Sequence, residues 1–414
     1  MRRPQRWKPI VGGLALMAAI TYGYQAMTTP TWEIIATDFT KSDKPYGGGA
    51  FRLHGNDMMS LKISKPELKF KPRNERKDPE VAEFTDEWMN SSDERLNRMT
   101  VSLLRGTINE GLSRYFQQNA QDAVWWYSKD WSTLYVVTDW MDYKPADPKN
   151  GRTPHIVKFW RSGDGGKTWT QLKWPEDHNI SDLLFLDSQR GYAIGWGPHL
   201  WRTADSGQSW QEIPLPPMAA DSGDPHKTFD ATDLGPDGVL RVAYYVPMRG
   251  KTPPSSVVYR LDWDATQFEQ DVVLPDQVVV QLGSADEPPG HTYSIYALSR
   301  LGPSQNLRDV NDEGERNGAL STWASYAQPM VEQLHTFNPR YKLDGLSVGK
   351  KGVLLVYATD ASREGAPHDI TFYSRDFSKS WNDLDDGAGQ GGWFDAQSNI
   401  QYGLYAYTLK KRQF

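Results

Sequence analysis

Short apolar runs rich in Val, Tyr, Trp and Phe recur along most of the chain, and Gly, Asp, Asn and Pro separate them. Each run has the length of a β-strand, and turn-forming residues follow about every 8–12 residues. This pattern predicts an all-β protein, either a sandwich, a barrel or a propeller. The runs lie at 123–128, 133–140, 155–162, 182–188, 191–196, 199–204, 239–246, 256–263, 277–282, 293–299, 352–359, 369–375 and 402–409.

Three octets in the sequence share one pattern. Residues 162–169 read SGDGGKTW, residues 203–210 read TADSGQSW and residues 374–381 read SRDFSKSW. Each octet begins with Ser or Thr, carries Asp at its third position and ends on Trp. The first two octets are 41 residues apart, from Trp169 to Trp210, which is about the length of one four-stranded propeller blade. The spacing therefore favours a propeller among the all-β architectures.

The octets resemble the Asp-boxes, or BNR repeats, of sialidase-type β-propellers, and the chain is similar to exported bacterial propellers such as the photosystem II assembly factor family. The resemblance implies that each octet lies in the turn between the third and fourth strands of a blade. The strand pattern predicts six or seven blades within residues 30–414, five of them at about 122–175, 180–215, 226–274, 276–338 and 343–385. We expect another blade to combine strands from both ends of the chain, because this pairing closes the ring and removes exposed edge strands.

The residue types of the octet explain a structural role. An Asp carboxylate accepts hydrogen bonds from the backbone of its own turn, Gly adopts positive φ, and a Trp buries a large apolar area. We interpret the octet residues as parts of structural turns, and not as catalytic carboxylates or calcium ligands. They are Ser162, Asp164, Gly166, Thr168, Trp169, Thr203, Asp205, Gly207, Ser209, Trp210, Ser374, Asp376, Ser380 and Trp381.

Two polar segments interrupt the strand pattern. Residues 65–99 are dense in charge, with a short helix expected from 79 to 88, and residues 300–332 are similarly polar. Both segments are expected as insertions in the propeller. They are either solvated loops or lids that bind a partner, because loops on rigid scaffolds often carry function.

Residues 1–28 differ from the rest of the chain. Arg2, Arg3, Arg6 and Lys8 precede an apolar stretch from about residue 10 to residue 27, and this segment contains no Asp or Glu. A stretch of this length is close to the ~17–20 residues of a transmembrane helix. The pattern predicts a signal anchor, with a cleaved signal peptide as the alternative. Either would place the propeller in the bacterial periplasm, with the basic residues of the anchor in the cytoplasm.

Composition excludes several classes of site. The chain has no Cys, so it has no disulfide, no Cys-ligated metal centre and no thiol nucleophile. Without the four basic residues near the N-terminus, 42 of the 46 Lys and Arg remain against 52 Asp and Glu, which gives little electrostatic support for a nucleic-acid partner. The eight His residues are scattered singly, and the acidic residues near Gly387 read as a solvated turn. We expect no metal and no cofactor.

Arg52 is the one candidate for a catalytic role. A sialidase of this fold needs three arginines that hold a substrate carboxylate, together with a Tyr–Glu pair and an acid Asp. The resemblance implies that the first of these arginines lies in a Phe-Arg-Ile-Pro motif, and residues 51–54 read FRLH, which departs from it after two residues. The other arginines considered lie in no such motif: Arg105, Arg241 and Arg300.

Two functions follow from these observations. The favoured one is a membrane-tethered periplasmic propeller that binds a protein partner without catalysis, because Trp, Tyr and Arg dominate the energetics of protein interfaces. Such a protein could be an immunity protein against a secreted antibacterial toxin, or an assembly factor for a membrane complex. The alternative is a sialidase-like exo-glycosidase.

Overall fold

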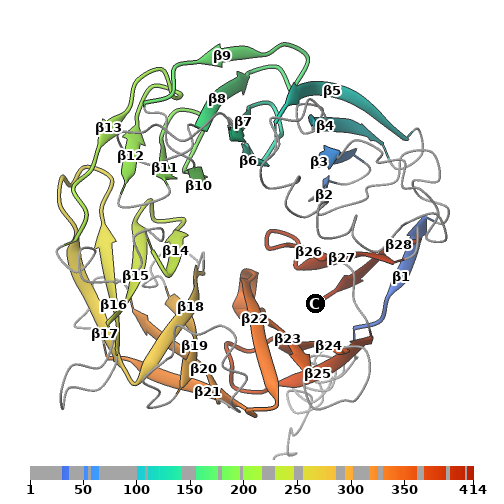
Figure 1. Ribbon diagram of the computed structural model, residues 1–414. Coiled ribbons are helices and arrows are strands. Elements are labelled where there is room, and N and C mark those ends of the chain that lie inside the picture. The colour runs from blue at the N-terminus through green and yellow to red at the C-terminus, as the bar shows by residue number, and fades with distance from the viewer. Residues whose placement is uncertain are drawn as a thin grey trace, which may run out of the picture.

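The computed structural model describes residues 30–36, 51–54, 57–64, 100–107, 111–120, 122–141, 155–175, 180–195, 199–216, 229–246, 255–285, 294–301, 317–324, 330–360, 368–387, 392–405 and 408–414. These residues form seven antiparallel sheets of four strands each, arranged as a ring around a central axis (Figure 1). The fold is therefore a seven-bladed β-propeller, which decides between the six and seven blades expected.

Six of the blades follow one another along the chain. Blade 1 contains β2 (Phe51–His54), β3 (Asp57–Ser64), β4 (Thr100–Thr107) and β5 (Gly111–Asn119). Blade 2 contains β6 (Asp122–Tyr127), β7 (Leu134–Met141), β8 (His155–Ser162) and β9 (Thr170–Leu172). Blade 3 contains β10 (Ile180–Phe185), β11 (Gly191–Gly195), β12 (Leu200–Thr203) and β13 (Gln211–Glu212).

The next three blades have the same order of strands. Blade 4 contains β14 (Ala231–Leu234), β15 (Leu240–Val246), β16 (Ser255–Leu261) and β17 (Glu269–Pro275). Blade 5 contains β18 (Gln277–Ser284), β19 (Ser294–Leu301), β20 (Gly318–Ala324) and β21 (Glu332–Phe337). Blade 6 contains β22 (Tyr341–Val348), β23 (Leu354–Asp360), β24 (His368–Ser374) and β25 (Asn382–Gly387), with the 3-10 turn η4 (Lys350–Gly352) after β22.

Blade 7 closes the ring with strands from both ends of the chain. It contains β26 (Gly392–Asp395), β27 (Ile400–Tyr405) and β28 (Thr408–Gln413), and β1 (Glu33–Ala36) is its outermost strand. Figure 1 shows the blue β1 along the red β28. The expected pairing of the termini is confirmed, and of the N-terminal strands only β1 takes part, because β2 and β3 belong to blade 1.

The core lies between neighbouring blades. Tyr135 and Phe159 of blade 2 pack with Phe185 and Trp201 of blade 3 in one buried cluster. The second strand of a blade is covered on both sides, and every residue of β11 is buried. This burial explains why the apolar runs in the sequence are nearly continuous and do not alternate strictly with polar residues.

The strand β20 lies inside the segment 300–332, which we expected as a polar insertion. Residues 318–324 pair with both β19 and β21, and five of these seven residues are buried. Its sequence GALSTWA consists mostly of small residues and lacks the β-branched run that marks the other strands, so it did not read as a strand. The polar insertion is therefore interrupted by a buried strand.

The expected signal anchor at 1–28, the insertion at 65–99 and the short helix at 79–88 lie outside the described residues. Within the described ranges, no helix has both the length and the apolar composition that crossing a bilayer requires.

Successive strands of a blade run in opposite directions, so the ring has two distinct faces. The turns between first and second strands and between third and fourth strands lie at the same end of the ring. The three octets are turns of the second kind, and we call this end the octet face. The opposite face contains the ends of the second strands and the starts of the third strands.

Candidate functional site

The three octets form turns with the same hydrogen bonds. In the first octet, the Ser162 hydroxyl and the Thr168 backbone N–H donate to Asp164 Oδ1 at 2.8 and 2.9 Å, and the Thr168 hydroxyl donates to Asp164 Oδ2 at 2.7 Å. Asp205 accepts the equivalent bonds from Thr203 and Ser209 at 2.9, 2.9 and 2.5 Å. Each carboxylate is thus occupied by its own turn.

The third octet repeats this arrangement in blade 6. Asp376 accepts bonds from the Ser374 hydroxyl and the Ser380 backbone N–H, each at 2.9 Å, and from the Ser380 hydroxyl at 2.6 Å. The three aspartates lie on blades 2, 3 and 6, so the fold does not bring them together.

The fourth residue of every octet ties the turn to the inner part of its own blade. Gly165, Ser206 and Phe377 have φ values of 73°, 66° and 59°. Their backbone N–H groups donate to the carbonyl oxygens of Ser132, Gln189 and Gly352 at 2.8, 2.9 and 3.1 Å. These acceptors lie in the turns between first and second strands, so the two turns of each of these blades form one rigid unit.

The hydrogen bonds hold the octet aspartates in their charged form. The Thr168 hydroxyl and N–H lower the pKa of Asp164 to about 2. For Asp205 and Asp376, partial burial opposes ionisation, but the bonds from Ser209 and Ser380 outweigh it and the pKa of each carboxyl is lowered. A carboxylate with a lowered pKa is a poor general acid at neutral pH.

The octet tryptophans close the turns by different contacts. Trp169 Nε1 donates to the Gly166 carbonyl at 2.8 Å, and Trp381 Nε1 donates to the Ser378 hydroxyl at 2.7 Å. Trp210 packs edge-on against Phe159 of the preceding blade, with ring centroids 5.7 Å apart. In the described part of the chain, no group of three or more His, Asp or Glu side chains could hold a metal ion.

Arg52 lies on β2, the innermost strand of blade 1, and reaches both neighbouring blades. Its Nε donates to the Tyr127 hydroxyl on β6 at 2.7 Å. Its guanidinium carbon lies 5.7 Å from the ring centroid of Trp125 on β6 and 5.6 Å from that of Trp393 on β26. All four side chains are half-buried, and we call them the inner aromatic cluster.

Charge and stacking fix the geometry of the inner aromatic cluster. Burial raises the pKa of the Tyr127 phenol, the nearby Arg52 partly offsets this rise, and Asp395 adds to it, so the phenol stays neutral at physiological pH. Trp393 stacks on Tyr402 of the same blade, with ring centroids 5.3 Å apart. Tyr127 is the last residue of β6 and places one end of the cluster at the octet face, whereas Trp393 is the second of the four residues of β26 and lies further along the inner strands.

The other candidate arginines do not join Arg52 in one site. Arg105 on β4 donates to the carbonyl oxygens of Trp131 and Gly165 in blade 2. Arg241 lies in blade 4 and Arg300 in blade 5. The structure therefore does not assemble these arginines into the carboxylate-binding set that a sialidase needs.

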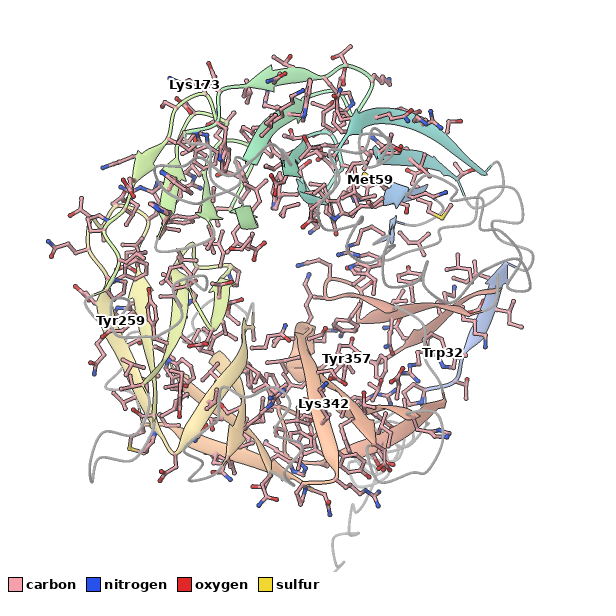
Figure 2. The ribbon with its side chains drawn as sticks, viewed as in Figure 1. Trp32, Met59, Lys173, Tyr259, Lys342 and Tyr357 are labelled. Carbon is pink, nitrogen blue, oxygen red and sulfur yellow. The ribbon has the colours of Figure 1, made fainter. Side chains whose placement is uncertain are left out.

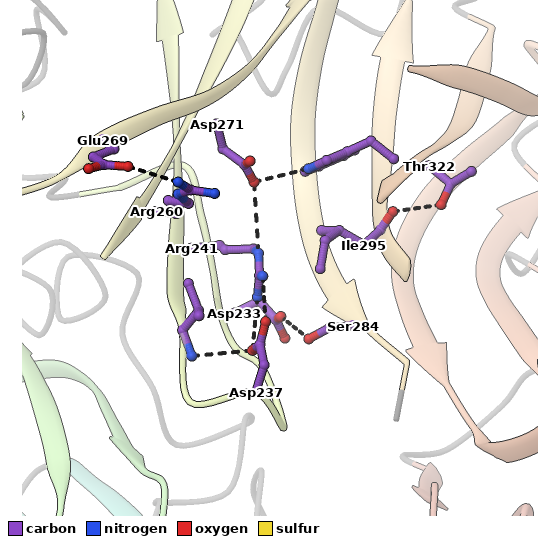
Figure 3. Close-up of polar contacts among 11 residues, drawn as sticks. Asp233, Asp237, Arg241, Arg260, Glu269, Asp271, Ser284, Ile295 and Thr322 are labelled. Atoms are coloured by element: carbon purple, nitrogen blue, oxygen red, sulfur yellow. Dashed lines mark hydrogen bonds and ion pairs between the residues drawn. The ribbon is translucent and has the colours of Figure 1, made fainter. Parts of the chain in front are cut away.

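Arg241 is instead the centre of a buried network between blades 4 and 5 (Figure 3). It donates to Asp237 at 2.6 and 3.2 Å, and its Nε lies 3.8 Å from Asp271. Trp323 of blade 5 donates to Asp271 at 3.0 Å, and Ser284 of blade 5 donates to Asp233. We call these six residues the inter-blade network: Asp233, Asp237, Arg241, Asp271, Ser284 and Trp323.

The inter-blade network is closed to solvent. The side chains of Arg241, Asp237 and Asp271 are 0%, 4% and 6% exposed. Burial raises the pKa of Asp233, although the Ser284 hydrogen bond and the Arg241 charge oppose this effect. The sequence analysis missed this network. Its one local signal is the spacing of four residues between Asp237 and Arg241 around a hairpin glycine.

The sequence matches no family model, and no curated protein is similar to it in sequence. Among solved structures, the chain is similar to YCF48 bound to a D1 peptide, with 10% identity, a TM-score of 0.47 and coverage of 76% of this chain and 87% of that one. It is also similar to YCF48 from Cyanidioschyzon merolae, with 12% identity, a TM-score of 0.46 and coverage of 78% and 92%. A third similar structure is the GH93 α-L-arabinofuranosidase of Fusarium graminearum with arabinobiose, with 13% identity, a TM-score of 0.35 and coverage of 70% and 91%. Similarity at this level concerns the arrangement of strands alone, and the function has to be inferred from the side chains of this chain.

Proposed function

We propose that this chain is a membrane-tethered periplasmic β-propeller that binds a protein partner without catalysis. The inner aromatic cluster is the observation that carries the proposal. It presents Arg52, two tryptophans and a tyrosine, half-buried, at the junction of three blades. Arg, Trp and Tyr are the residues that supply most of the binding energy at protein interfaces. Rigid aromatic side chains lose little conformational entropy when a partner binds.

The state of the other polar groups supports binding without catalysis. The octet aspartates are engaged by their own turns, and we propose that the three octets are structural turns of the Asp-box kind. Arg241 is enclosed by carboxylates and is not open to a substrate. Neither group offers the pair of accessible carboxylates that glycoside hydrolysis requires.

The tether and the periplasmic location rest on the sequence of residues 1–28. Four basic residues precede a long apolar stretch there, which is the pattern of a signal anchor. Two partner classes suit a tethered propeller. One is a subunit of a membrane complex that the propeller helps to assemble, and the other is a secreted toxin that it neutralises.

The proposal is tested by affinity capture from the native membrane fraction with the wild type, Trp125→Ala and Trp393→Ala. We expect one partner to co-purify with the wild type and each variant to bind it at least about 30-fold more weakly, as for a hot spot. Lys173→Ala, at an exposed site on blade 2, is the control that should keep the partner. A partner that both tryptophan variants retain would contradict the proposed site.

A sialidase-like glycosidase is the second candidate, and one observation favours it. Arg52 and the Tyr127 hydroxyl are in direct contact on inner strands, with Asp395 near enough to affect the phenol. Robust turnover of a fluorogenic sialoside by the full chain, lost in both Arg52→Ala and Tyr127→Phe, would replace the binding proposal with this one.

A further inference from the structure

The N-terminal segment enters the ring at the octet face. Glu33 at the start of β1 pairs with Lys411, and Ala36 at its end pairs with Leu409. β28 ends at the octet face, because the Phe414 backbone N–H donates to the Asn399 carbonyl at 2.9 Å in the turn between β26 and β27. Since β1 runs antiparallel to β28, the chain before Glu33 leaves the ring on that same face.

Trp32 fixes this point of entry. Its ring lies 4.3 Å from the guanidinium carbon of the buried Arg412, and a Cβ at Gly403 would lie only 3.0 Å from it. Figure 2 shows Trp32 beside blade 7. The predicted anchor ends at residue 28, and an extended chain spans at most about 3.6 Å per residue, so the tether from there to Trp32 is shorter than about 15 Å.

A basic and aromatic surface lies on the neighbouring blade 6 at the same face. It consists of Lys350 and Lys351 in one turn and of Phe377 and Lys379 in the third octet. We call these four residues the basic-aromatic patch. Phe377 is 41% exposed and has φ of 59°, a backbone conformation that is uncommon for a bulky residue. Gly165 and Ser206 hold the same position in the other octets, so the turn itself does not need an aromatic side chain.

Hydrogen bonds join the patch to the point of entry. The Asn399 side chain accepts from the Lys350 backbone N–H at 2.9 Å and donates to the Lys350 carbonyl at 3.0 Å. The Phe377 N–H donates to the Gly352 carbonyl in the same turn of blade 6. The Asn399 carbonyl also accepts from the Phe414 N–H, so hydrogen bonds link the Lys350 turn of blade 6 to the end of β28, the strand that pairs with β1.

The charge of this surface is opposite to that of the whole protein. The patch carries three lysines, and the carboxylate of Asp376 beside them is held by hydrogen bonds inside its own turn. On blade 7 at the same face, Asp395 accepts from the Gln397 N–H and the Ser398 hydroxyl, and Glu33 lies 3.4 Å from Lys411. The complete chain has a net charge of −6. Clustered lysines attract anionic lipid headgroups, and exposed aromatic side chains enter the interfacial region of a bilayer.

We propose that the octet face of blades 6 and 7 lies against the anionic surface of the membrane that holds the N-terminal segment. This inference rests on the proposed tether. The Tyr127 end of the inner aromatic cluster is at the same face, so this orientation turns that end toward the bilayer. The partner of the propeller is then a protein segment at the membrane surface, which favours the assembly role over neutralisation of a free toxin.

The experiment measures depth with the full chain in nanodiscs that contain phosphatidylcholine and phosphatidylglycerol. Because the chain has no Cys, one introduced Cys carries a single fluorophore. Phe377→Cys, where the attached aromatic fluorophore takes the place of the phenyl ring, reports on the patch, and Lys342→Cys, exposed near the opposite end of β22 in the same blade, is the matched control. We expect a nitroxide on the lipid headgroup to quench the probe at 377 several-fold more strongly than the probe at 342.

The lysine arm tests lipid recognition. Lys379→Ala should weaken the contact with anionic nanodiscs about fivefold. Lys167→Ala, at the same octet position in blade 2, should leave the quenching at 377 unchanged. If the quenching of the probe at 377 changes neither with Lys379→Ala nor with the fraction of anionic lipid, the proposed lipid contact is wrong.

The remaining outcomes separate the two proposals. Equal quenching at 377 and 342, or stronger quenching at 342, in a chain that still floats with the lipid would overturn the orientation and leave the tether standing. A full chain that does not float with the lipid would overturn the tether, and the orientation with it.

Discussion

Aspartates of this ring show opposite ionisation behaviour in two surroundings. Asp164 sits in an exposed turn whose hydroxyl and N–H groups point at it, and its pKa falls to about 2. Asp233 sits between two blades, where burial raises its pKa. An aspartate in the sequence therefore does not by itself indicate a functional carboxylate. The number of hydrogen-bond donors around the carboxyl group and its access to water decide whether it is ionised.

Asp205→Ala should destabilise the ring. The substitution removes three hydrogen bonds that the side chain accepts, so we expect a loss of about 1–3 kcal/mol in the free energy of unfolding. Urea denaturation measures this loss, and Lys167→Ala, at an exposed position of the first octet, is the control. The pKa of Asp205 is lowered in the fold, so its contribution is present above the unfolded value of 3.8 and lost as pH falls. If Asp205→Ala unfolds at the same urea concentration as the wild type, the structural role of the octet is contradicted.

Gly207→Ala should be strongly destabilising, because Gly207 is buried in the turn of the second octet. Gly207 has φ of 80°, and an added Cβ would lie 2.3 Å from the buried ring of Phe159 in blade 2. Alanine is strained at this left-handed backbone conformation, and its Cβ overpacks the contact with Phe159. Together these effects should lower the free energy of unfolding by about 2–4 kcal/mol. Gly163→Ala is the matched control, because a Cβ there meets nothing closer than 3.7 Å and its backbone is unstrained. Similar melting temperatures for the two variants would refute this packing of blades 2 and 3.

Asp233→Asn should change how stability depends on pH. The folded-state pKa of Asp233 is raised, so its stabilising contribution is complete below the unfolded pKa and is lost as pH rises through the folded value. Asn cannot ionise and still accepts from Ser284. We expect the variant to gain stability over the wild type as pH increases from 4 to 8, measured by thermal unfolding. A constant difference across this range would show that Asp233 does not titrate in the fold.

At the scale of elements, the sequence predicts strands wherever β-branched and aromatic residues cluster. The run at 239–246 became β15 and the run at 352–359 became β23 almost residue for residue. β20 was missed because GALSTWA obtains its stability from the blades around it and not from its own composition. The inter-blade network was missed for a related reason, since Asp233, Asp271 and Ser284 stand on three separate strands whose proximity only the fold creates.

Arg241→Met should weaken the junction of blades 4 and 5. The arginine is completely buried, and its removal leaves Asp237 and Asp271 without a positive charge between them. Loss of one partner from a buried ion pair costs about 3–5 kcal/mol. Arg190→Ala breaks an ion pair with Asp187 whose side chains are 43% and 41% exposed, and it should cost less than about 1 kcal/mol. Chemical denaturation of both variants makes the comparison, and equal losses would contradict a structural role for the network.

At the scale of the whole molecule, ring closure creates the features that sequence reasoning could not predict. Arg52 meets Trp393 only because blade 7 returns to blade 1, although 341 residues separate them in the chain. The Phe-Arg pair at residues 51–52 drew attention to Arg52, but no local pattern indicates Trp125 or Trp393 as its neighbours. The expected closing blade was correct because an open ring would leave edge strands unpaired, a general property of sheets that needs no family knowledge.

Deletion of β1 should therefore affect the whole ring and not blade 7 alone. A chain that starts at residue 37 lacks the outer partner of β28 and uncovers Arg412, whose side chain is buried under Trp32. β28 then stays paired with β27 but becomes an edge strand whose open side can pair with a second copy, so we expect a lower melting temperature and concentration-dependent association in size-exclusion chromatography.

A chain that starts at residue 30 keeps β1 and is the matched control. Trp32→Ala in that chain should fall between the two, because it uncovers Arg412 but keeps the strand. If the chains starting at 30 and 37 melt alike and stay monomeric, β1 is dispensable for the ring. The short tether before β1 would then no longer fix the octet face of the propeller toward the membrane.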